Sequence, residues 1–134
     1  MIESADEFIR LRTSEIKEEY DRSTYDTADI STWTELINNY PDYKQWVIHN
    51  KTVPIEILEV LTFDNDPNIR SLVARKRKIN DKIFKALSTD KDENVRHSLI
   101  YNSGLTIEKL KQINTADSDW LAGQLRQRLI EIEK

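Results

Sequence analysis

A stretch of 26 residues that occurs twice in succession constrains this chain more than any other feature of its sequence. Residues 51–76 and 77–102 align without a gap, and matched positions carry the same kind of side chain. A period of this length is typical of proteins built from stacked supersecondary units. The matched pairs are Ile57 and Ile83, Leu58 and Phe84, Leu61 and Leu87, Asp64 and Asp90, Asp66 and Asp92, Ile69 and Val95, Arg70 and Arg96, Val73 and Leu99, and Ala74 and Ile100.

Two weaker copies flank this pair. Residues 103–116 begin a further copy, in which Thr106, Ile107, Leu110 and Ile113 take the first-helix positions. With one inserted residue, Asp117-Ser118-Asp119 then reproduces the Asp-x-Asp pattern of the earlier copies. A looser copy over residues 29–50 precedes them, and its apolar positions are held by Trp33, Leu36, Ile37, Trp46 and Val47.

Each copy predicts two short helices. Its apolar residues recur every three or four positions, which is the spacing of a helix rather than of a strand. Asp66 and Asp92 precede the second helix, where an Asp side chain accepts hydrogen bonds from free backbone N–H groups. Pro67 suits the first helical position, and Pro54 and Asn80 mark the start of the first helix. The helix pair is therefore the expected unit.

Helices of eight or nine residues are marginal alone, so such pairs must stack and cover one another. The sequence thus predicts an all-α fold, a short right-handed α-solenoid with helical caps. We expect one domain over residues 1–134, with an N-terminal helical cap at 1–28 and a C-terminal capping helix at 117–134. The repeats between them are expected at about 29–50, 51–76, 77–102 and 103–116.

The two caps have signals of their own. Ser4-x-x-Glu7 matches a capping box at the start of the first helix, and Thr13-Ser14 is expected to divide the N-terminal region into two helices. At the other end, one apolar stripe is predicted on the last helix. This stripe comprises Leu121, Leu125, Leu129 and Ile132.

The repeated pattern resembles that of HEAT-like repeats, and especially of the bacterial leucine-rich repeat variant family. The residues that carry the resemblance are Thr52 to Leu61, Asp-x-Asp-x-x-Ile/Val-Arg and the closing Lys or Asn of each copy. The resemblance covers about residues 29–125 and implies a fold rather than one function. Members resembling this chain include small bacterial proteins that neutralise a toxin or act as an adaptor or scaffold. The period here is longer, and the cysteine cluster of some members is missing, so no iron–sulfur site is implied.

Composition excludes several classes of site. The chain has no cysteine, so disulfides and cysteine-ligated metals are excluded, and its two glycines are too few for a Gly-rich phosphate loop. The acidic first residues do not form a secretory signal, and no apolar run is long enough to span a membrane. We therefore expect a cytoplasmic protein without cofactor, membrane contact or evident small-molecule substrate.

Charge is distributed unevenly along the chain. Residues 1–69 carry 15 acidic and 6 basic residues, whereas residues 70–134 carry 9 acidic and 14 basic residues. The cations gather at residues 70–85, and a run from Arg75 through Lys76 and Arg77 to Lys78 falls between two helices. These cations, with Arg70 and Arg96, are candidates for binding phosphate or an acidic protein surface. Alternatively, Arg70 and Arg96 bond the adjacent repeat while the run is only solvated.

A second candidate surface is aromatic. Trp33, Tyr40, Tyr43 and Trp46 fall close together in the sequence, and such residues are enriched at protein interfaces. Trp33 and Trp46 occupy positions that hold core residues in the other copies. Tyr40 and Tyr43 are therefore the candidates for an exposed contact.

Other constellations favour structural roles. The Asp-x-Asp pairs lack the further oxygen ligands and glycine of a calcium loop, so helix capping explains them better. His49 and His97 fall at different positions of the repeat, which disfavours a zinc site. No nucleophile motif or P-loop is present, so no metal and no catalytic residue is predicted.

These patterns predict a non-enzymatic protein-binding module whose partner is an unknown protein. Nucleic-acid binding through the basic edge at residues 70–96 is the alternative, disfavoured by the formal net charge of −4. A less favoured alternative is an enzyme resembling HEAT-like DNA glycosylases. It would need a carboxylate in an aromatic cleft, which only Asp42, beside Tyr40, Tyr43 and Trp46, approximates.

Overall fold

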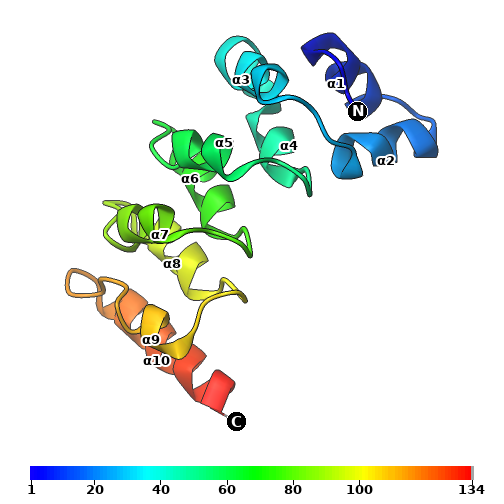
Figure 1. Ribbon diagram of the computed structural model, residues 1–134. Helices are drawn as coiled ribbons and strands as arrows, with labels where there is room; N and C mark the ends of the chain where they lie inside the picture. Colours follow the sequence, from blue (N-terminus) through cyan, green and yellow to red (C-terminus); the bar gives the residue numbers. More distant parts are fainter. Residues whose placement is uncertain (134) are drawn as a thin grey trace. The chain divides into compact units, whose positions relative to one another are not determined.

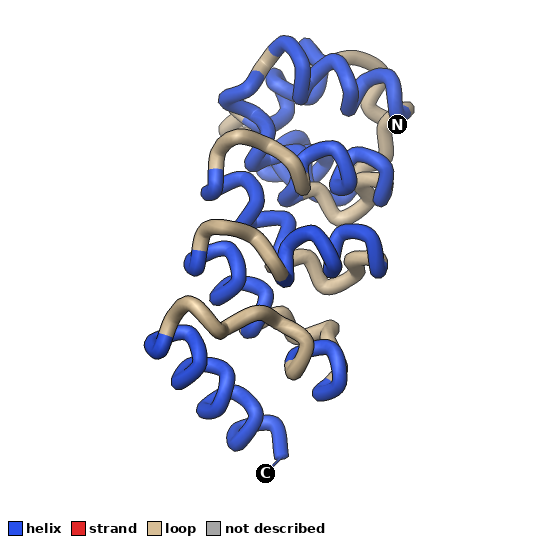
Figure 2. The backbone as a smooth tube through the Cα atoms, turned by 90° about the vertical axis from the view of Figure 1, so that its left-hand side faces the viewer, coloured by secondary structure: helices blue, strands red, loops and turns tan. Residues whose placement is uncertain are grey.

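A computed structural model describes residues 1–133, and every regular element in them is a helix apart from one isolated parallel bridge between Ile2 and Ala28 (Figures 1 and 2). The predicted all-α fold class is therefore confirmed. The elements are α1 (Ala5–Arg12), α2 (Lys17–Tyr25), α3 (Ile30–Asn39), the 3-10 turn η1 (Pro41–Tyr43), α4 (Lys44–His49), α5 (Ile55–Leu61), α6 (Pro67–Ala74), α7 (Asp81–Ser88), α8 (Glu93–Ile100), α9 (Ile107–Leu110) and α10 (Asp119–Glu133).

The chain divides into two compact units, residues 1–58 and the residues from Glu59 onward. The division falls within α5, so it does not coincide with a repeat boundary. The single domain expected over residues 1–134 stays a prediction, and we describe each unit separately.

The N-terminal unit packs α1, α2, α3 and α4 around one apolar core. Trp33 is fully buried, as predicted, and its ring meets that of Phe8 edge-on with centroids 5.4 Å apart. Trp46 is half-buried, and the Arg12 guanidinium covers one face of its ring, with its carbon 3.6 Å from the ring centre. The prediction of core packing is thus confirmed for Trp33 and is only partly right for Trp46.

Backbone capping sets the ends of α1 and α2. The Ser4 hydroxyl accepts a hydrogen bond from Glu7 N at 3.0 Å, as the capping box predicts. The Glu7 carboxylate accepts a hydrogen bond from Glu3 N at 2.8 Å, one residue earlier than the capping box predicts. The predicted division at Thr13-Ser14 is confirmed, since α1 ends at Arg12 and α2 begins at Lys17.

The C-terminal unit places the second helices of successive repeats side by side. Helix α8 packs between α6 and α10, while α7 packs on α6 and α8, and α9 packs on α10 (Figures 1 and 2). The predicted apolar positions of this unit are buried. They are Leu61, Ile69, Val73, Ala74, Ile83, Phe84, Leu87, Val95, Leu99 and Ile100. Ile57 and Leu58, at the end of the N-terminal unit, are buried as well.

The helix caps repeat without the insertion that the sequence suggested. Asp66 and Asp92 accept hydrogen bonds from the N–H two residues later, both as predicted. In the next repeat the cap is Ser118, whose hydroxyl accepts from Leu121 N at 3.1 Å. Ser118 lies 26 residues after Asp92, so the cap keeps the period. The assignment of Asp119 to this role is wrong, because Asp119 is already the first residue of α10.

The last helix is only partly covered. Of its predicted apolar stripe, Leu121 is buried, Leu125 and Leu129 are half-buried, and Ile132 is 36% exposed. No further repeat in residues 1–133 packs on its outer side. Residue 134, the end of the predicted capping helix, lies outside the described residues.

A buried asparagine anchors the loop between α6 and α7. Asn102 donates hydrogen bonds to the carbonyls of Ala74 at 2.8 Å and Lys76 at 2.7 Å, and it accepts one from Gly104 N. Asn50, two repeats earlier, makes the equivalent bonds to the Ser23 and Asp26 carbonyls within the N-terminal unit. The residue that closes a repeat therefore fixes the loop of the repeat before it.

The two glycines provide a matched test of this packing. A Cβ on Gly104 would lie 2.2 Å from the Arg77 carbonyl oxygen, whereas one on Gly123 would meet only the flexible end of Arg126 at 3.7 Å. We expect Gly104→Ala to lower the free energy of unfolding by about 2 kcal/mol through overpacking. Gly123→Ala should raise it by about 0.5–1 kcal/mol, because glycine is unfavourable within a helix.

Urea unfolding followed by circular dichroism measures both changes. Equal effects of the two substitutions would show that the loop after α6 does not rest on Gly104.

Candidate binding surface

Arg70, on α6, contacts the loop between α7 and α8. Its Nε and Nη2 donate to the two carboxylate oxygens of Asp90 at 2.7 and 3.2 Å. Its Nη1 donates to the carbonyls of Asp64 and Asn65. The Arg70 and Asp90 side chains are 9% and 7% exposed, and the Asp90 hydrogen bonds raise the Arg70 pKa above its ordinary value.

Arg96 repeats this arrangement in the following copy. Its two terminal nitrogens donate to Asp117 at 2.7 and 2.9 Å, and one also donates to the Asn114 carbonyl at 2.8 Å. The side chain is 1% exposed. The one-residue insertion appears here, because Arg96 and Asp117 are 21 residues apart whereas Arg70 and Asp90 are 20 apart.

Both arginines therefore fill the structural role given as the alternative to binding. Each joins the second helix of one repeat to the loop of the next through charge-assisted hydrogen bonds to oxygen acceptors, although Arg96 Nε is buried without a hydrogen-bond partner. Their guanidinium groups are buried and do not add to a cationic surface. The remaining candidates of the basic run behave differently.

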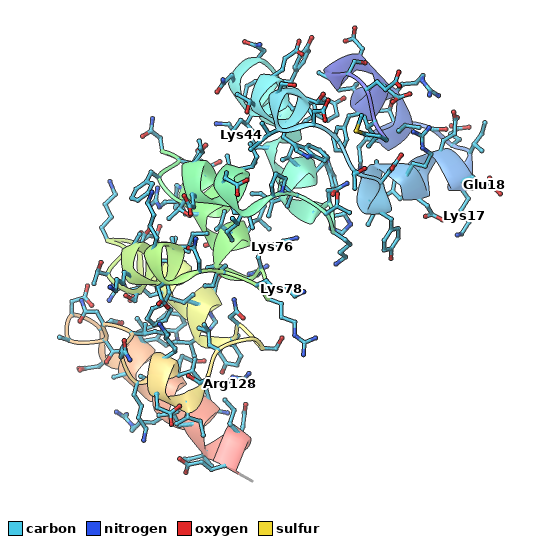
Figure 3. The ribbon with its side chains drawn as sticks, in the orientation of Figure 1. Lys17, Glu18, Lys44, Lys76, Lys78 and Arg128 are labelled. Atoms are coloured by element: carbon cyan, nitrogen blue, oxygen red, sulfur yellow. The ribbon has the colours of Figure 1, made fainter. Side chains whose placement is uncertain are left out.

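The loop between α6 and α7 presents the other predicted cations. Arg75, Arg77 and Lys78 are exposed and Lys76 is half-buried; Figure 3 shows Lys76 and Lys78 on the same side of the unit. Among residues 1–133, no ion pair involves Arg75, Arg77 or Lys78. Asn102 is hydrogen-bonded to the Lys76 carbonyl, and Gly104 packs against the Arg77 carbonyl. The backbone that carries these cations is therefore fixed in position.

A cavity of about 300 Å³ adjoins this loop on the face formed by α6 and α8. Arg75 belongs to both features, and the cavity contains no acidic side chain. Asn68 and Asn94 are exposed, and among residues 1–133 no hydrogen bond uses their side-chain amides. The lining residues are Asn68, Ser71, Leu72, Arg75, Asn94, His97 and Ser98.

Aromatic side chains continue this face from α8 onto α10. The His97 ring stacks on Trp120, with centroids 4.8 Å apart, and lies 5.1 Å from Tyr101. Trp120 and Tyr101 remain 47% and 40% exposed. Arg128, on α10, places its guanidinium carbon 5.5 Å from the centre of the Tyr101 ring (Figure 3). We call the cavity, these aromatics, Arg128 and residues 75–78 the basic-aromatic face.

A second cavity, of about 310 Å³, lies at the loops that precede α6 and α8. Arg70 and Asp90 are on its wall and are already paired with each other. Lys91 adds a cation and Phe63, which is 65% exposed, adds an apolar side chain. Its charged groups offer less to a ligand than the basic-aromatic face does.

The predicted tyrosines Tyr40 and Tyr43 belong to the N-terminal unit. Tyr40 is the C-cap of α3 and Tyr43 ends η1, and both are half-buried rather than exposed. Asp42, the carboxylate considered for an enzyme, is exposed on the same turn. The binding role of Tyr40 and Tyr43 stays a prediction.

Within residues 1–133 no three His, Asp or Glu side chains gather closely enough to hold a metal ion. In the same residues, no helix has the length and apolar character needed to cross a membrane.

Comparison with known proteins found no match among family models, curated proteins or solved structures. The resemblance to HEAT-like repeats and to the leucine-rich repeat variant family therefore rests on the residues of this chain and stays a prediction.

Sequence reasoning missed most of the basic-aromatic face. His97 and Tyr101 meet Trp120 of α10, whose register depended on the misplaced insertion. With the cap at Ser118, a shift of 26 residues aligns Asn68, Asn94 and Trp120 on successive second helices. The unpaired polar positions of the repeat were therefore the signal that could have found this face.

The Arg96 pair predicts a pH-dependent contribution to stability. Hydrogen bonds from Arg96 lower the pKa of the Asp117 carboxyl below its ordinary value. The unfolded chain thus binds this proton more readily, so the contribution is full above about pH 4 and is lost as pH falls through the lowered pKa. Unfolding free energies of the wild type and Asp117→Asn should therefore converge as the pH is lowered.

Urea unfolding at a series of pH values provides the measurement. In an Arg96→Leu background the same Asp117→Asn substitution should lose its pH-dependent effect. A gap between wild type and Asp117→Asn that stays constant down to about pH 2 would contradict the pairing.

Proposed function

We propose that this chain is a non-enzymatic protein-binding module and that its basic-aromatic face binds an acidic surface of another protein. The single observation that carries the proposal is the fixed loop with the exposed cations Arg75, Arg77 and Lys78. Side chains that lack an internal partner are available to an external carboxylate, and a loop already held in place loses little entropy on binding.

The composition of the neighbouring surface supports a protein partner. Exposed Trp120 and Tyr101 lie on the same face, and aromatic residues together with arginine are enriched at interface centres. The acidic residues at the helix starts, Asp66, Asp92 and Asp119, would repel a continuous phosphate backbone. Nucleic-acid binding through residues 70–96 is therefore the second candidate, supported by the same three cations.

We further propose that the helix pairs stack as a right-handed solenoid of HEAT-like repeats. We also propose that the protein is cytoplasmic. Two features that recur along the chain support the solenoid. They are a second helix with a side-chain N-cap and a buried arginine that bonds the next loop. Such stacks offer extended surfaces for scaffold, adaptor or immunity roles.

A twelve-residue glutamate oligomer tests the proposed partner chemistry. Fluorescence polarisation should detect its binding to the full chain at low salt, with affinity falling as salt screens the charges. The triple variant Arg75→Gln, Arg77→Gln and Lys78→Gln should weaken binding about tenfold, because exposed ion pairs contribute up to about 1 kcal/mol each.

A matched triple variant removes equal charge elsewhere. Lys17, Lys91 and Lys111 are exposed cations outside the basic-aromatic face, and their change to Gln should leave the affinity within about twofold. Equal weakening by the two triple variants would indicate nonspecific attraction. A twelve-nucleotide oligothymidylate that binds more tightly than the glutamate oligomer would favour nucleic acid instead.

A further inference from the structure

The geometry of the basic-aromatic face points to a more specific ligand. We propose that it binds an extended segment of the partner across α6, α8 and α10, with two acidic side chains about six residues apart that pair with Arg75 and Arg128. This inference rests on the proposed function, because it names the form in which the acidic partner is recognised.

The two arginines lie at similar distances along the chain from the starts of two helices of this face. Arg75 directly follows α6, and Arg128 is on α10. Arg75 is eight residues after the start of α6, and Arg128 is nine residues after the start of α10. Among residues 1–133 neither forms an ion pair, and no hydrogen bond uses the terminal guanidinium nitrogens of either side chain. Both therefore retain donors for a carboxylate.

The spacing of the acidic side chains follows from the helix packing. Adjacent packed helices are separated by about 9 Å, so two helix spacings amount to about 18 Å. An extended chain advances about 3.3 Å per residue, which places the two acids five to six residues apart. Since alternate side chains of an extended segment point to opposite sides, six residues is the separation that turns both acids to the protein.

The middle of the face suits the residues between the two acids. The exposed rings of Tyr101 and Trp120 provide an apolar platform beside α8. Ser71 and Asn94 line the adjoining cavity and carry donors and acceptors that match peptide groups. One apolar side chain on the same side as the acids completes the expected pattern.

The charge pattern favours a peptide over a nucleic acid. The starts of α8 and α10 carry Glu93 and Asp119, and the cations lie toward the other ends of the helices. A nucleic acid has a negative charge at every nucleotide and would bring some of them near these acids. A segment with two separated acids meets only the two arginines.

Two peptides of identical composition test the spacing. In fluorescein-GSETSTLTESG-amide the glutamates are six residues apart, and in fluorescein-GSTSELETTSG-amide they are two apart. Binding to the full chain is measured by fluorescence polarisation at low salt. We expect the widely spaced peptide to bind at least about fivefold more tightly, because only it can form both ion pairs.

Substitutions then assign the contacts. Arg75→Ala and Arg128→Ala should each reduce the affinity for the widely spaced peptide to that for the other peptide, while Lys111→Ala should change neither. Circular dichroism establishes that each variant keeps its helices. If either arginine variant unfolds, Arg75→Gln or Arg128→Gln replaces it.

The outcomes separate the two proposals. Equal binding of the two peptides, while the glutamate oligomer still binds, would overturn the extended-segment proposal and leave the proposed function. Failure of the glutamate oligomer as well would overturn both. Tighter binding of oligothymidylate than of the widely spaced peptide would replace the peptide by a nucleic acid.

Discussion

A buried arginine that bonds the loop of the next repeat is the interaction on which the C-terminal unit depends. The second helices are eight residues long, too short to be stable alone, and their caps satisfy only part of their free backbone groups. Arg70 and Arg96 add planar donors that reach a carboxylate and loop carbonyls in fixed geometry. Breaking the Arg70–Asp90 pair on one side would leave a buried charge, which typically costs about 3–5 kcal/mol.

The same interaction separates structural from available charge. The guanidinium groups of Arg70 and Arg96 are buried and form ion pairs. In contrast, Arg75, Arg77 and Lys78 are exposed on a loop whose backbone is hydrogen-bonded to Asn102. The surface that we propose for binding is therefore formed by exposed cations, while buried arginine–carboxylate pairs connect the helices beneath it. This division gives the basic-aromatic face its fixed position, and fixed positions favour affinity because little ordering remains for the complex.

The repeat made most of the C-terminal unit predictable. Its period and its caps at Asp66 and Asp92 follow from local rules, and its buried apolar positions do so as well. The cap at Ser118 was missed because Asp117, the partner of Arg96, comes one residue late and shifts the Asp-x-Asp pattern to Asp119. Nothing in the spacing could show that Trp46 would be covered by Arg12, or that His97 would stack on Trp120, because these contacts depend on rotamers and helix packing.

The most direct measurement of the central claim is amide hydrogen exchange in the Arg70→Leu variant, followed residue by residue. If the arginine joins neighbouring repeats, exchange should accelerate at α8 and at the loop that contains Asp90, beyond the helix that carries the substitution. Acceleration confined to α6, with α7 and α8 protected as in the wild type, would show that the repeats are held together without it.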